Sequence, residues 1–302
     1  EFLEWLKKEG YIEEYQGMLM LTGKGTRRLR QDALKEIFTR LKKSPFGEHE
    51  TPYSGEGVER LSETKPFQFG DQPSNIDFTA TISNAIRREG LEQINLKEED
   101  FEVYETEHQT TCATVLMLDI SHSMILYGED RITPAKKVAM ALAELILTKY
   151  PKDSLDVVVF GDKAVQVKLE DIPRIAVGPY HTNTKDALEL GRRILRKKRN
   201  ANKQIFMITD GKPSAIFDRG RLYKNPYGLD RKIVNKTLEE ARICRKDKII
   251  ITTFMVARDP WLVDFVKQLT EVNQGRAYYS SLNKLGEYIF VDYIRNRKHR
   301  LR

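Results

Sequence analysis

The stretch of sequence that decides the fold runs from Thr114 to Met124 and reads Thr-Val-Leu-Met-Leu-Asp-Ile-Ser-His-Ser-Met. The four apolar residues after the threonine do not alternate with polar ones, so they predict a strand that is buried on both faces. The strand ends in the carboxylate of Asp119, and the hydroxyls of Ser121 and Ser123 follow it. Such hard oxygen ligands suit Mg²⁺ or Mn²⁺, and the carboxyl ends of parallel strands are where α/β sheets place their sites.

Two further pieces of sequence complete a pattern downstream. Residues 204–209 are again largely apolar and lead directly into Asp210. Between the two strands, residues 178–184 read Gly-Pro-Tyr-His-Thr-Asn-Thr and open a helical run. In order, the pieces are Asp-x-Ser-x-Ser, Thr-x-Thr and Asp. With these motifs the chain, over about residues 109–302, resembles the von Willebrand factor A (VWA) domain with its metal-ion-dependent adhesion site.

The resemblance implies a role for each residue of the pattern. The hydroxyls of Ser121 and Ser123 would bind the metal directly, while Asp119 and Asp210 would supply negative charge directly or through water. Thr182 would be a ligand that joins or leaves with a change of conformation. Two carboxylates and three hydroxyls leave an octahedral Mg²⁺ partly hydrated, so an Asp or Glu of a partner protein can displace water and complete the shell. The chain is therefore expected to bind a protein through Mg²⁺ or Mn²⁺ and to need no reaction.

Simpler explanations remain open for the same side chains. Asp119 by itself could cap the turn that follows its strand, and the two serines could be ordinary loop residues. Of the two threonines, Thr184 is the expected helix cap and Thr182 the expected ligand. Asp259 also follows an apolar strand, but Pro260 comes next, which is typical of an N-cap followed by the first helical residue. We therefore leave Asp259 out of the metal site.

The residues around the pattern predict a rim that contacts the partner. His122 stands where the family usually has Gly, and residues 125–131 form a longer loop than usual. Neither His122 nor His181 has His, Cys or carboxylate neighbours at zinc-site spacing, so we expect both to line the rim. Residues 211–230 are predicted to be a long polar loop on the same face, either part of the rim or a mobile loop without a role. The predicted rim consists of His122, Tyr127, Tyr180, His181 and Lys212.

Composition restricts the partners and the compartment. The chain has 302 residues and a net charge of +7, with basic runs at 192–199 and 295–302. These runs could meet nucleic acid or an acidic protein face, but no aromatic residues interleave them for base stacking, so nucleic acid is not the expected partner. Two distant cysteines, Cys112 and Cys244, with no signal peptide and no 18-residue apolar stretch, favour a cytoplasmic protein that is not embedded in a membrane.

Three regions are predicted along the chain. Residues 1–43 form a helical segment that resembles the last part of a winged-helix domain. Residues 44–108 combine a linker, rich in turn residues, with an extension that packs on the sheet, and residues 109–302 form the VWA domain. Within the extension, residues 76–88 have helical spacing, and residues 101–107 alternate cleanly and are expected to add a strand to the sheet.

From residue 109 onward, strands and helices alternate. This order predicts an α/β fold with a doubly wound, mostly parallel sheet of the VWA or Rossmann-like kind. A turn signal at residues 161–163 predicts a hairpin, and hence one antiparallel edge strand. The predicted strands are 113–118, 155–160, 164–169, 204–209, 249–256 and 276–279, and the predicted helices are 133–149, 185–198, 232–246, 261–272 and 284–295.

The resemblance also suggests a partner. Cytoplasmic bacterial VWA proteins often work beside AAA+ ATPases of the MoxR or magnesium-chelatase type, which implies an accessory role for this chain. An enzyme is not expected: a phosphotransferase of the haloacid dehalogenase kind needs a second Asp where this chain has Ser121, and neither a Walker A run nor a Gly-x-Ser-x-Gly elbow is present. The alternative function is a nucleic-acid-binding regulator that uses the winged-helix-like start and the basic runs.

Overall fold

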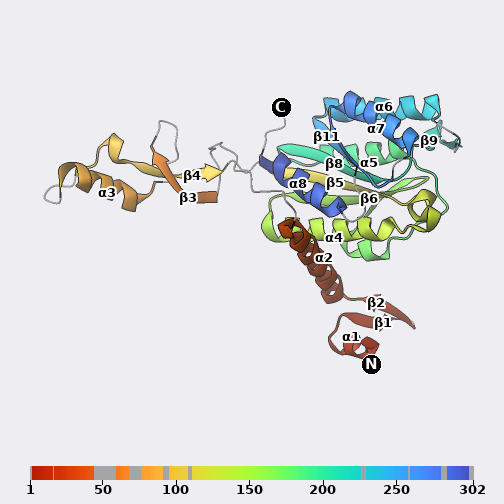
Figure 1. Cartoon of the computed structure of the whole chain (residues 1–302), viewed down its shortest axis with the longest axis horizontal. Coiled ribbons are helices and arrows are strands. Elements are labelled where there is room, and N and C mark those ends of the chain that lie inside the picture. Colours follow the sequence, from red (N-terminus) through yellow and green to blue (C-terminus); the bar gives the residue numbers. More distant parts are fainter. Residues whose placement is uncertain are drawn as a thin grey trace. The chain divides into compact units, whose positions relative to one another are not determined.

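The chain forms two compact units. The computed structural model describes residues 2–15, 17–43, 59–67, 76–90, 95–107, 111–225, 227, 229–257, 259–279 and 284–298. One unit joins residues 1–46 to residues 111–302, and the other consists of residues 47–110 (Figure 1). The larger unit contains the central β-sheet and all the residues of the predicted metal site.

The central sheet confirms the predicted fold class. In the described part of the chain it has six strands, in the order β12 (Arg276–Tyr279), β11 (Ile249–Met255), β8 (Asn202–Thr209), β5 (Cys112–Asp119), β6 (Ser154–Phe160) and β7 (Ala164–Val167). All neighbouring strands run parallel except β7, which pairs with β6 antiparallel at one edge. The antiparallel edge follows from the short turn at residues 161–163, because parallel strands need a much longer crossover.

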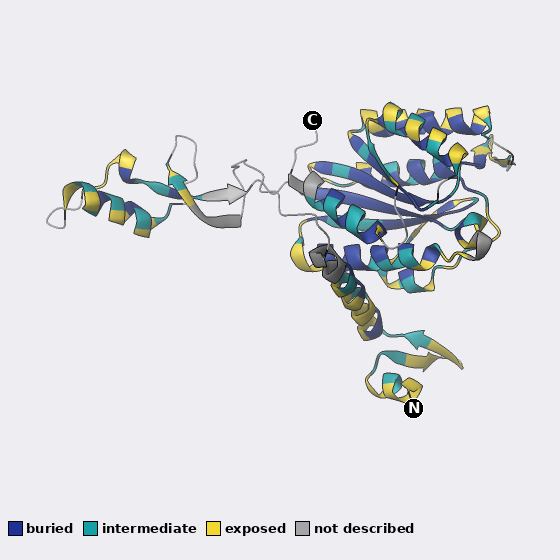
Figure 2. Ribbon diagram, viewed as in Figure 1, coloured by how far each residue is buried: buried dark blue, intermediate teal, exposed yellow. Residues whose placement is uncertain are grey.

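Helices cover both faces of the sheet, as Figures 1 and 2 show. They are α4 (Ile132–Lys149), α5 (Thr184–Arg196), α6 (Arg231–Lys246), α7 (Pro260–Asn273) and α8 (Leu285–Lys298), with the 3₁₀ turns η3 (His122–Gly128) and η4 (Leu169–Arg174). Along β5, Leu116 and Leu118 belong to the core under α4 and α8, whereas Val115 and Met117 belong to the core under α5, α6 and α7. Because successive strand side chains point to opposite faces, one unbroken apolar run fills both cores.

The N-caps of two helices test the sequence predictions. Asn183 caps α5, since its side chain accepts a 3.1 Å hydrogen bond from the amide of Asp186, and Thr184 is already the first helical residue. The prediction of Thr184 as the cap is therefore wrong, because Asn serves this position at least as well as Thr. Asp259 caps α7 by accepting a 2.9 Å hydrogen bond from the amide of Leu262, as predicted.

Residues 211–230 do not form the long polar loop that was predicted. They contain an antiparallel hairpin of β9 (Ala215–Asp218) and β10 (Arg221–Lys224). The two turn residues, Arg219 and Gly220, have φ angles of 48° and 79°, as expected for a two-residue hairpin turn with positive φ at both positions. The hairpin escaped prediction because Arg stands where Asn or Asp usually marks such a turn.

The N-terminal part of the larger unit packs on the helices α4 and α8 through one helix. Its elements are α1 (Phe2–Lys8), β1 (Ile12–Tyr15), β2 (Met18–Leu21) and α2 (Gly23–Lys43). Thr22 caps α2 by accepting a 3.1 Å hydrogen bond from the third amide of the helix. Against α4 and α8, Arg30 pairs with the buried Glu144 at 3.1 Å, and Ile37 lies where a side chain at Gly286 would be. Among the described helices, none is long and apolar enough to cross a bilayer.

The smaller unit has a sheet of its own. Its described elements are β3 (Glu59–Pro66), α3 (Phe78–Glu89), η2 (Glu98–Asp100) and β4 (Glu102–Glu107). The prediction that residues 101–107 extend the central sheet is wrong, because β4 pairs antiparallel with β3, whose polar sequence carries little strand signal. The predicted helix at 76–88 is confirmed as α3, capped by Asp77. Residues 44–58 and 68–75 of the predicted linker and extension lie outside the described residues.

Candidate metal centre

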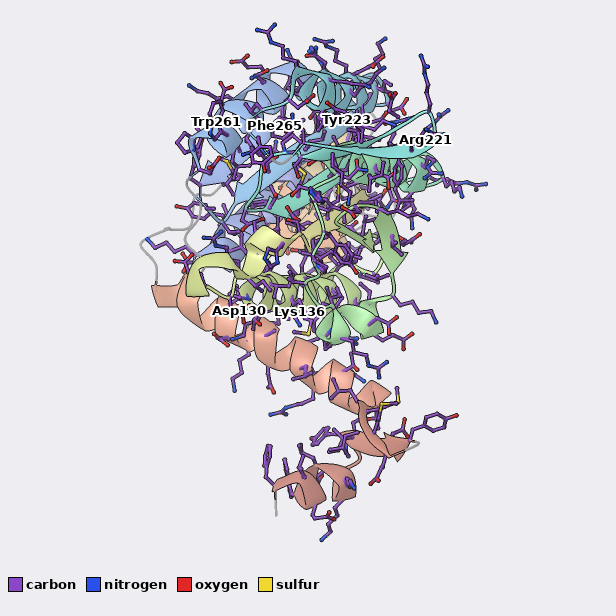
Figure 3. All side chains as sticks on the ribbon, turned by 90° about the vertical axis from the view of Figure 1, so that its right-hand side faces the viewer. Asp130, Lys136, Arg221, Tyr223, Trp261 and Phe265 are labelled. Carbon is purple, nitrogen blue, oxygen red and sulfur yellow. The ribbon has the colours of Figure 1, made fainter. Side chains whose placement is uncertain are left out.

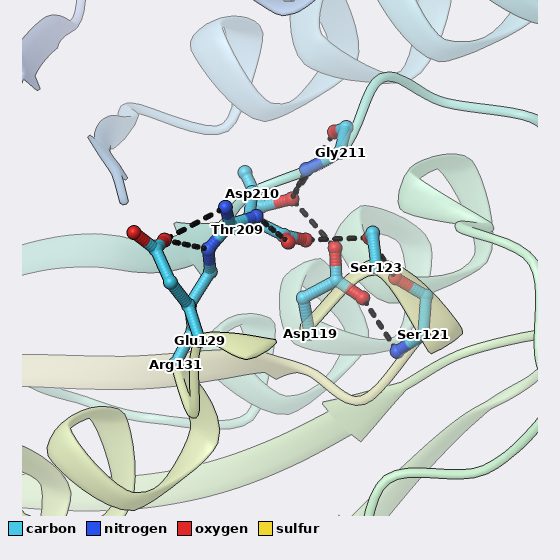
Figure 4. A network of polar contacts seen from close by, with 8 residues as sticks. All are labelled: Asp119, Ser121, Ser123, Glu129, Arg131, Thr209, Asp210 and Gly211. Carbon is cyan, nitrogen blue, oxygen red and sulfur yellow. Dashed lines mark hydrogen bonds and ion pairs between the residues drawn. The ribbon is translucent and has the colours of Figure 1, made fainter. Parts of the chain in front are cut away.

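Two neighbouring strands bring the two predicted carboxylates to one edge of the sheet. Strands β5 and β8 are adjacent and parallel, with Leu118 opposite Ile208. Asp119 and Asp210 therefore follow at the same end of the sheet, which is the end where α/β folds place their binding sites. The chain after β5 then turns back over this edge as η3 and brings both serines of the first motif beside the carboxylates (Figure 4).

Four of the five predicted ligands form one chain of hydrogen bonds (Figure 4). The amide of Ser121 donates to Asp119 Oδ1 at 2.9 Å, and the hydroxyl oxygens of Ser121 and Ser123 are 3.1 Å apart. The hydroxyl of Ser123 then donates to Asp210 Oδ1 at 2.6 Å. The other oxygen of Asp119 accepts a 2.6 Å hydrogen bond from the hydroxyl of Thr209, which orients that carboxylate.

The fifth predicted ligand, Thr182, lies at the same place. Gly211 follows Asp210 and has no side chain. A Cβ atom on this glycine would lie 3.1 Å from Ser123 Oγ, 3.2 Å from Thr182 Oγ1 and 4.0 Å from Asp119 Oδ2. Oxygens from three predicted ligands therefore surround the space that Gly211 leaves open. The structure thus brings all five predicted ligands together, although they come from three separate segments.

The segment that carries Thr182 is held by backbone contacts on several sides. The amide of His122 donates to the carbonyl of Tyr180 at 3.1 Å, and the amide that follows Thr182 donates to the carbonyl of Gly161 at 2.9 Å. The amide of Thr182 itself donates to Ser214 Oγ at 3.0 Å, just before β9. The segment after β5, the turn between β6 and β7, and the residue just before β9 therefore all help to position Thr182.

Two buried carboxylates close together make this site electrostatically costly without a cation. Asp119 is fully buried, and the side chain of Asp210 is also inaccessible to solvent. Burial, together with repulsion from Asp210, raises the pKa of Asp119 to about 7. Burial also raises the pKa of Asp210, although hydrogen bonds from Ser123 and Arg131 oppose this effect. A positive charge placed between the two carboxylates would favour the ionised form of both.

One residue of the site, Arg131, was missed by the sequence predictions. Its Nη1 atom lies 2.6 Å from Asp210 Oδ2, and its Nε and Nη2 atoms lie 3.1 and 2.9 Å from Glu129 Oε2. It stands immediately before α4, at the end of the 125–131 loop. A cation is unfavourable at a helix N-terminus, and this conflict is the one signal in the sequence that could have pointed to a specific acidic partner.

The donor set fits a hard divalent cation. In the part of the chain that the structure describes, no three or more His, Cys, Asp or Glu side chains are placed to hold a metal together. The centre instead combines two carboxylates with three hydroxyls, and the missing side chain of Gly211 leaves room beside them. All of these donors are oxygens, which suits a partly hydrated Mg²⁺ or Mn²⁺ and not a soft metal.

The residues predicted for the partner rim differ in exposure. Tyr180 is 42% exposed, and His122 is also exposed. His181 and Lys212 are half-buried, and the side chain of Tyr127 lies outside the described residues. Of the predicted rim, Tyr180 and His122 are therefore the described side chains that offer most surface to a partner.

Exposed apolar side chains also stand on segments that follow strands of the sheet, and one of them, Trp261, lies outside the predicted rim. Trp261 is 52% exposed in the first turn of α7, the helix that follows β11, and Ile125 is 46% exposed in η3. Tyr223 on β10 is 37% exposed. Figure 3 labels Trp261, at the start of α7, and Tyr223, on the β9–β10 hairpin. Trp261 escaped prediction because its position was counted only as part of a helix.

The first basic run is partly used inside the fold. Arg192 pairs with Glu240 at 2.5 Å, and Lys198 pairs with Asp156 at 2.7 Å. These cations are therefore neutralised by the unit itself and are not free for an acidic partner. The side chains of the second basic run lie outside the described residues.

Solved structures of other proteins share the fold. A mutant of the PilB minor pilin from Streptococcus sanguinis is 14% identical, with 66% of this chain and 65% of that chain covered and a TM-score of 0.53. The vWF domain of the type V pili tip protein Mfa5 from Porphyromonas gingivalis is 12% identical, with 64% of this chain and 97% of that chain covered and a TM-score of 0.51. At these identities the likeness shows the fold alone.

Sequence relatives identify the family. The uncharacterized protein Rv0959 from Mycobacterium tuberculosis is 31% identical over 304 residues, covering 97% of this chain and 44% of the relative, and the uncharacterized protein Mb0984 from Mycobacterium bovis matches equally well. The chain thus spans less than half of the length of these relatives. Residues 59–106 match the family described as "Rv0959-like protein, third domain", and residues 112–294 match "Rv0959-like protein, vWA domain". The chain therefore belongs to the Rv0959-like family of proteins that contain a vWA domain.

Proposed function

We propose that this chain is a protein-binding module that depends on a divalent cation. Asp119, Ser121, Ser123, Thr182 and Asp210 would hold Mg²⁺ or Mn²⁺, and an Asp or Glu side chain of a partner would complete the coordination. The single observation that carries the proposal is the convergence of these five oxygen-bearing side chains at one edge of the sheet, with oxygens of three of them around the space beside Gly211.

The carboxylates and the hydroxyls of the centre would contribute to metal binding in different ways. Asp119 and Asp210 are buried, and the pKa of each is raised. A bound divalent cation would stabilise their ionised forms and so lower the free energy of the site. The hydroxyls of Ser121, Ser123 and Thr182 add ligands without further negative charge. When bound, the cation supplies an open coordination position for a carboxylate, because five protein donors do not satisfy a hard octahedral ion completely.

The surroundings of the centre support a protein as the ligand. Tyr180, Trp261 and Ile125 expose apolar surface near the edge that holds the carboxylates. Aromatic residues are enriched at protein interfaces, where they supply much of the binding energy around a central contact. A metal that captures one carboxylate would therefore be surrounded by side chains able to bury the neighbouring part of the partner.

We propose binding and not catalysis for this site. Ser121 and Ser123 hydrogen-bond to each other, and Ser123 donates to Asp210. The ring of His181 lies beside Asp162, at 3.2 Å between Nδ1 and Oδ1. Among the described contacts, no imidazole ring reaches either serine hydroxyl, which supports a role for these hydroxyls as metal ligands rather than as nucleophiles activated by a histidine.

Calorimetry with Mn²⁺ tests the metal site. Wild type is expected to bind one ion, and Asp119→Ala is expected to bind it at least about tenfold more weakly, since one charged ligand is lost. Asp259→Ala is the matched control, because Asp259 also follows a strand of the sheet but caps α7 instead. Equal affinity of wild type and Asp119→Ala would contradict the assignment.

A second measurement addresses the partner. By resemblance to cytoplasmic VWA proteins, we propose a MoxR-type AAA+ ATPase that offers an Asp or Glu side chain. Purified ATPase and this chain are expected to co-elute in Mg²⁺ and to separate in EDTA, and Asp119→Ala is expected to separate in both. Co-elution that survives both EDTA and Asp119→Ala would show an interaction that does not use the metal.

A further inference from the structure

The candidate centre contains a positive charge of its own. Arg131 reaches Asp210 Oδ2 with Nη1 at 2.6 Å, while the other oxygen of Asp210 accepts from Ser123. Both partners of the ion pair are withdrawn from water, with 12% of the Arg131 side chain and 0% of the Asp210 side chain exposed. A charged hydrogen bond in such a place is strong, because there is little water to screen it. One oxygen of a predicted metal ligand is therefore already occupied by a guanidinium group.

We propose that Arg131 competes with the divalent cation for Asp210 and so sets the metal affinity of the site. This inference rests on the proposed function. In the metal-free protein the guanidinium group compensates one of the two buried carboxylates. A divalent cation that uses Asp210 must overcome both this hydrogen bond and the repulsion between itself and the arginine. Arg131 thereby keeps the affinity of the centre below what its oxygen donors alone would give.

Glu129 offers Arg131 a second place to stay. Glu129 Oε2 lies 3.1 Å from Nε and 2.9 Å from Nη2 of Arg131, on the edge of the guanidinium group that Asp210 does not use. Its side chain is 58% exposed. The arginine can therefore release Asp210 and remain paired with Glu129 near the surface, where solvent also stabilises its charge. Arg131 therefore has two acidic partners. Asp210 pairs with it when no metal is bound, and Glu129 can stay paired with it after the metal has bound.

This arrangement gives two substitutions opposite signs. Removing the charge of Arg131 removes the competitor, so metal affinity is expected to rise. Removing the charge of Glu129 removes the alternative partner and leaves the positive potential of Arg131 less neutralised, so metal affinity is expected to fall. A residue that merely holds the loop in shape would weaken binding whichever side of the pair is changed.

The experiment is calorimetric titration of the whole chain with Mn²⁺, using wild type, Arg131→Gln and Glu129→Gln. We expect Arg131→Gln to bind about tenfold more tightly than wild type, and Glu129→Gln about threefold more weakly, since the exposed carboxylate is better screened. Arg192→Gln is the matched control. Its side chain is 14% exposed and paired with Glu240 at 2.5 Å, outside the centre, so its Mn²⁺ affinity is expected to equal that of wild type.

A further variant, Arg131→Lys, changes the side chain but keeps its positive charge, so it separates an effect of charge from a folding defect. Circular dichroism and the thermal midpoint show whether each variant is folded. Arg131→Lys is expected to bind Mn²⁺ more weakly than Arg131→Gln, because it keeps a positive charge beside Asp210. Wild type that binds Mn²⁺ as tightly as or more tightly than Arg131→Gln overturns the competition while the proposed metal site stands. If neither wild type nor Arg131→Gln binds Mn²⁺ at millimolar concentration, both proposals are overturned. Tighter binding by Arg131→Gln than by wild type, lost in the double variant Arg131→Gln/Asp119→Ala, supports both proposals.

Discussion

The larger unit buries carboxylates in two regions that differ in how their charge is compensated. At the carboxyl end of β5 and β8, Asp119 and Asp210 lie close together, and one arginine serves the pair. On α8, Asp292 is only 2% exposed, but it lies 2.7 Å from Arg276 and accepts a 2.8 Å hydrogen bond from Tyr278. Among the described contacts, the first region holds two buried carboxylates beside one arginine, whereas the second holds one buried carboxylate beside one arginine.

The difference separates a binding site from a structural contact. A buried carboxylate that is paired and hydrogen-bonded holds its surroundings in place, and removing it leaves an uncompensated partner. Two buried carboxylates that share one cation keep an excess of negative charge, which a ligand of opposite charge can relieve. Burial alone therefore does not indicate function; the balance of charge around the buried group does.

The structural region also holds α8 in one register. Besides Asp292, the helix carries Tyr293, whose hydroxyl donates to Asp153 Oδ2 at 2.7 Å. Asp153 in turn accepts a 3.0 Å hydrogen bond from the amide of Cys112 at the start of β5. From the other side, Ile37 of α2 packs against Gly286. Contacts of this kind fix α8 against the sheet independently of the metal centre.

The largest effect is expected from breaking the structural region. Asp292→Ala should lower the free energy of unfolding by about 3 kcal/mol, because Arg276 stays partly buried without its partner and a tyrosine hydroxyl loses its acceptor. Urea denaturation measures this loss, and Asp264→Ala, on exposed surface of α7, serves as the control. The Mn²⁺ affinity of Asp292→Ala should match that of wild type. A loss of metal binding without a loss of stability would reverse the roles assigned to the two regions.

Substitution of Asp119 in the candidate metal centre should raise the free energy of unfolding of the metal-free protein, whereas Asp292→Ala lowers it. The folded pKa of Asp119, about 7, lies above its unfolded value, so the favourable contribution of protonated Asp119 is complete below about pH 4 and is lost as the pH rises through 7. In EDTA, wild type should therefore lose stability between about pH 4 and pH 7, and Asp119→Asn should lose less. Asp119→Asn should exceed wild type by about 1–2 kcal/mol at pH 8. Thermal melts across this range would contradict the charge argument if both proteins changed in parallel.

Removing the metal should have a smaller effect. The predicted ligands are rim residues of the sheet, and the two cores beneath do not depend on them. With Mn²⁺ at about ten times its dissociation constant, binding adds about 1.4 kcal/mol, so chelation should lower the thermal midpoint by about 3–6 °C. Scanning calorimetry with and without EDTA measures the shift. Cooperative unfolding on chelation at room temperature would instead reveal a structural metal.

The smallest expected effect concerns the start of α5, beside Thr182. Asn183→Ala should lower the free energy of unfolding by about 1 kcal/mol, since the helix loses its cap. Thr184→Ala should change it less, because Thr184 is a helical residue and not the cap. Chemical denaturation of the two variants compares them directly. A larger loss of unfolding free energy for Thr184→Ala than for Asn183→Ala would support Thr184 as the cap, as the sequence suggested.

Local patterns were sufficient for most of the fold. The unbroken apolar runs predicted buried strands, and their alternation with amphipathic segments predicted the doubly wound sheet, because these periodicities depend only on neighbouring residues. Two short antiparallel strand pairs were beyond such patterns. The turn of β9 and β10 uses Arg-Gly, and β3 has too few apolar residues to signal a strand, so each is defined by its pairing partner.

For the candidate centre, the sequence alone pointed to the five candidate donor residues, because each stands near the end of a strand or the start of a helix, and parallel strands end at one edge. Only the tertiary structure decided what surrounds them. It brought Thr182 beside Gly211, paired Arg131 with Asp210, and buried Asp119 deeply enough to shift its pKa. Contacts between distant segments and the removal of water have no local signature in a sequence, so the balance of charge at this site emerges only when the chain has folded.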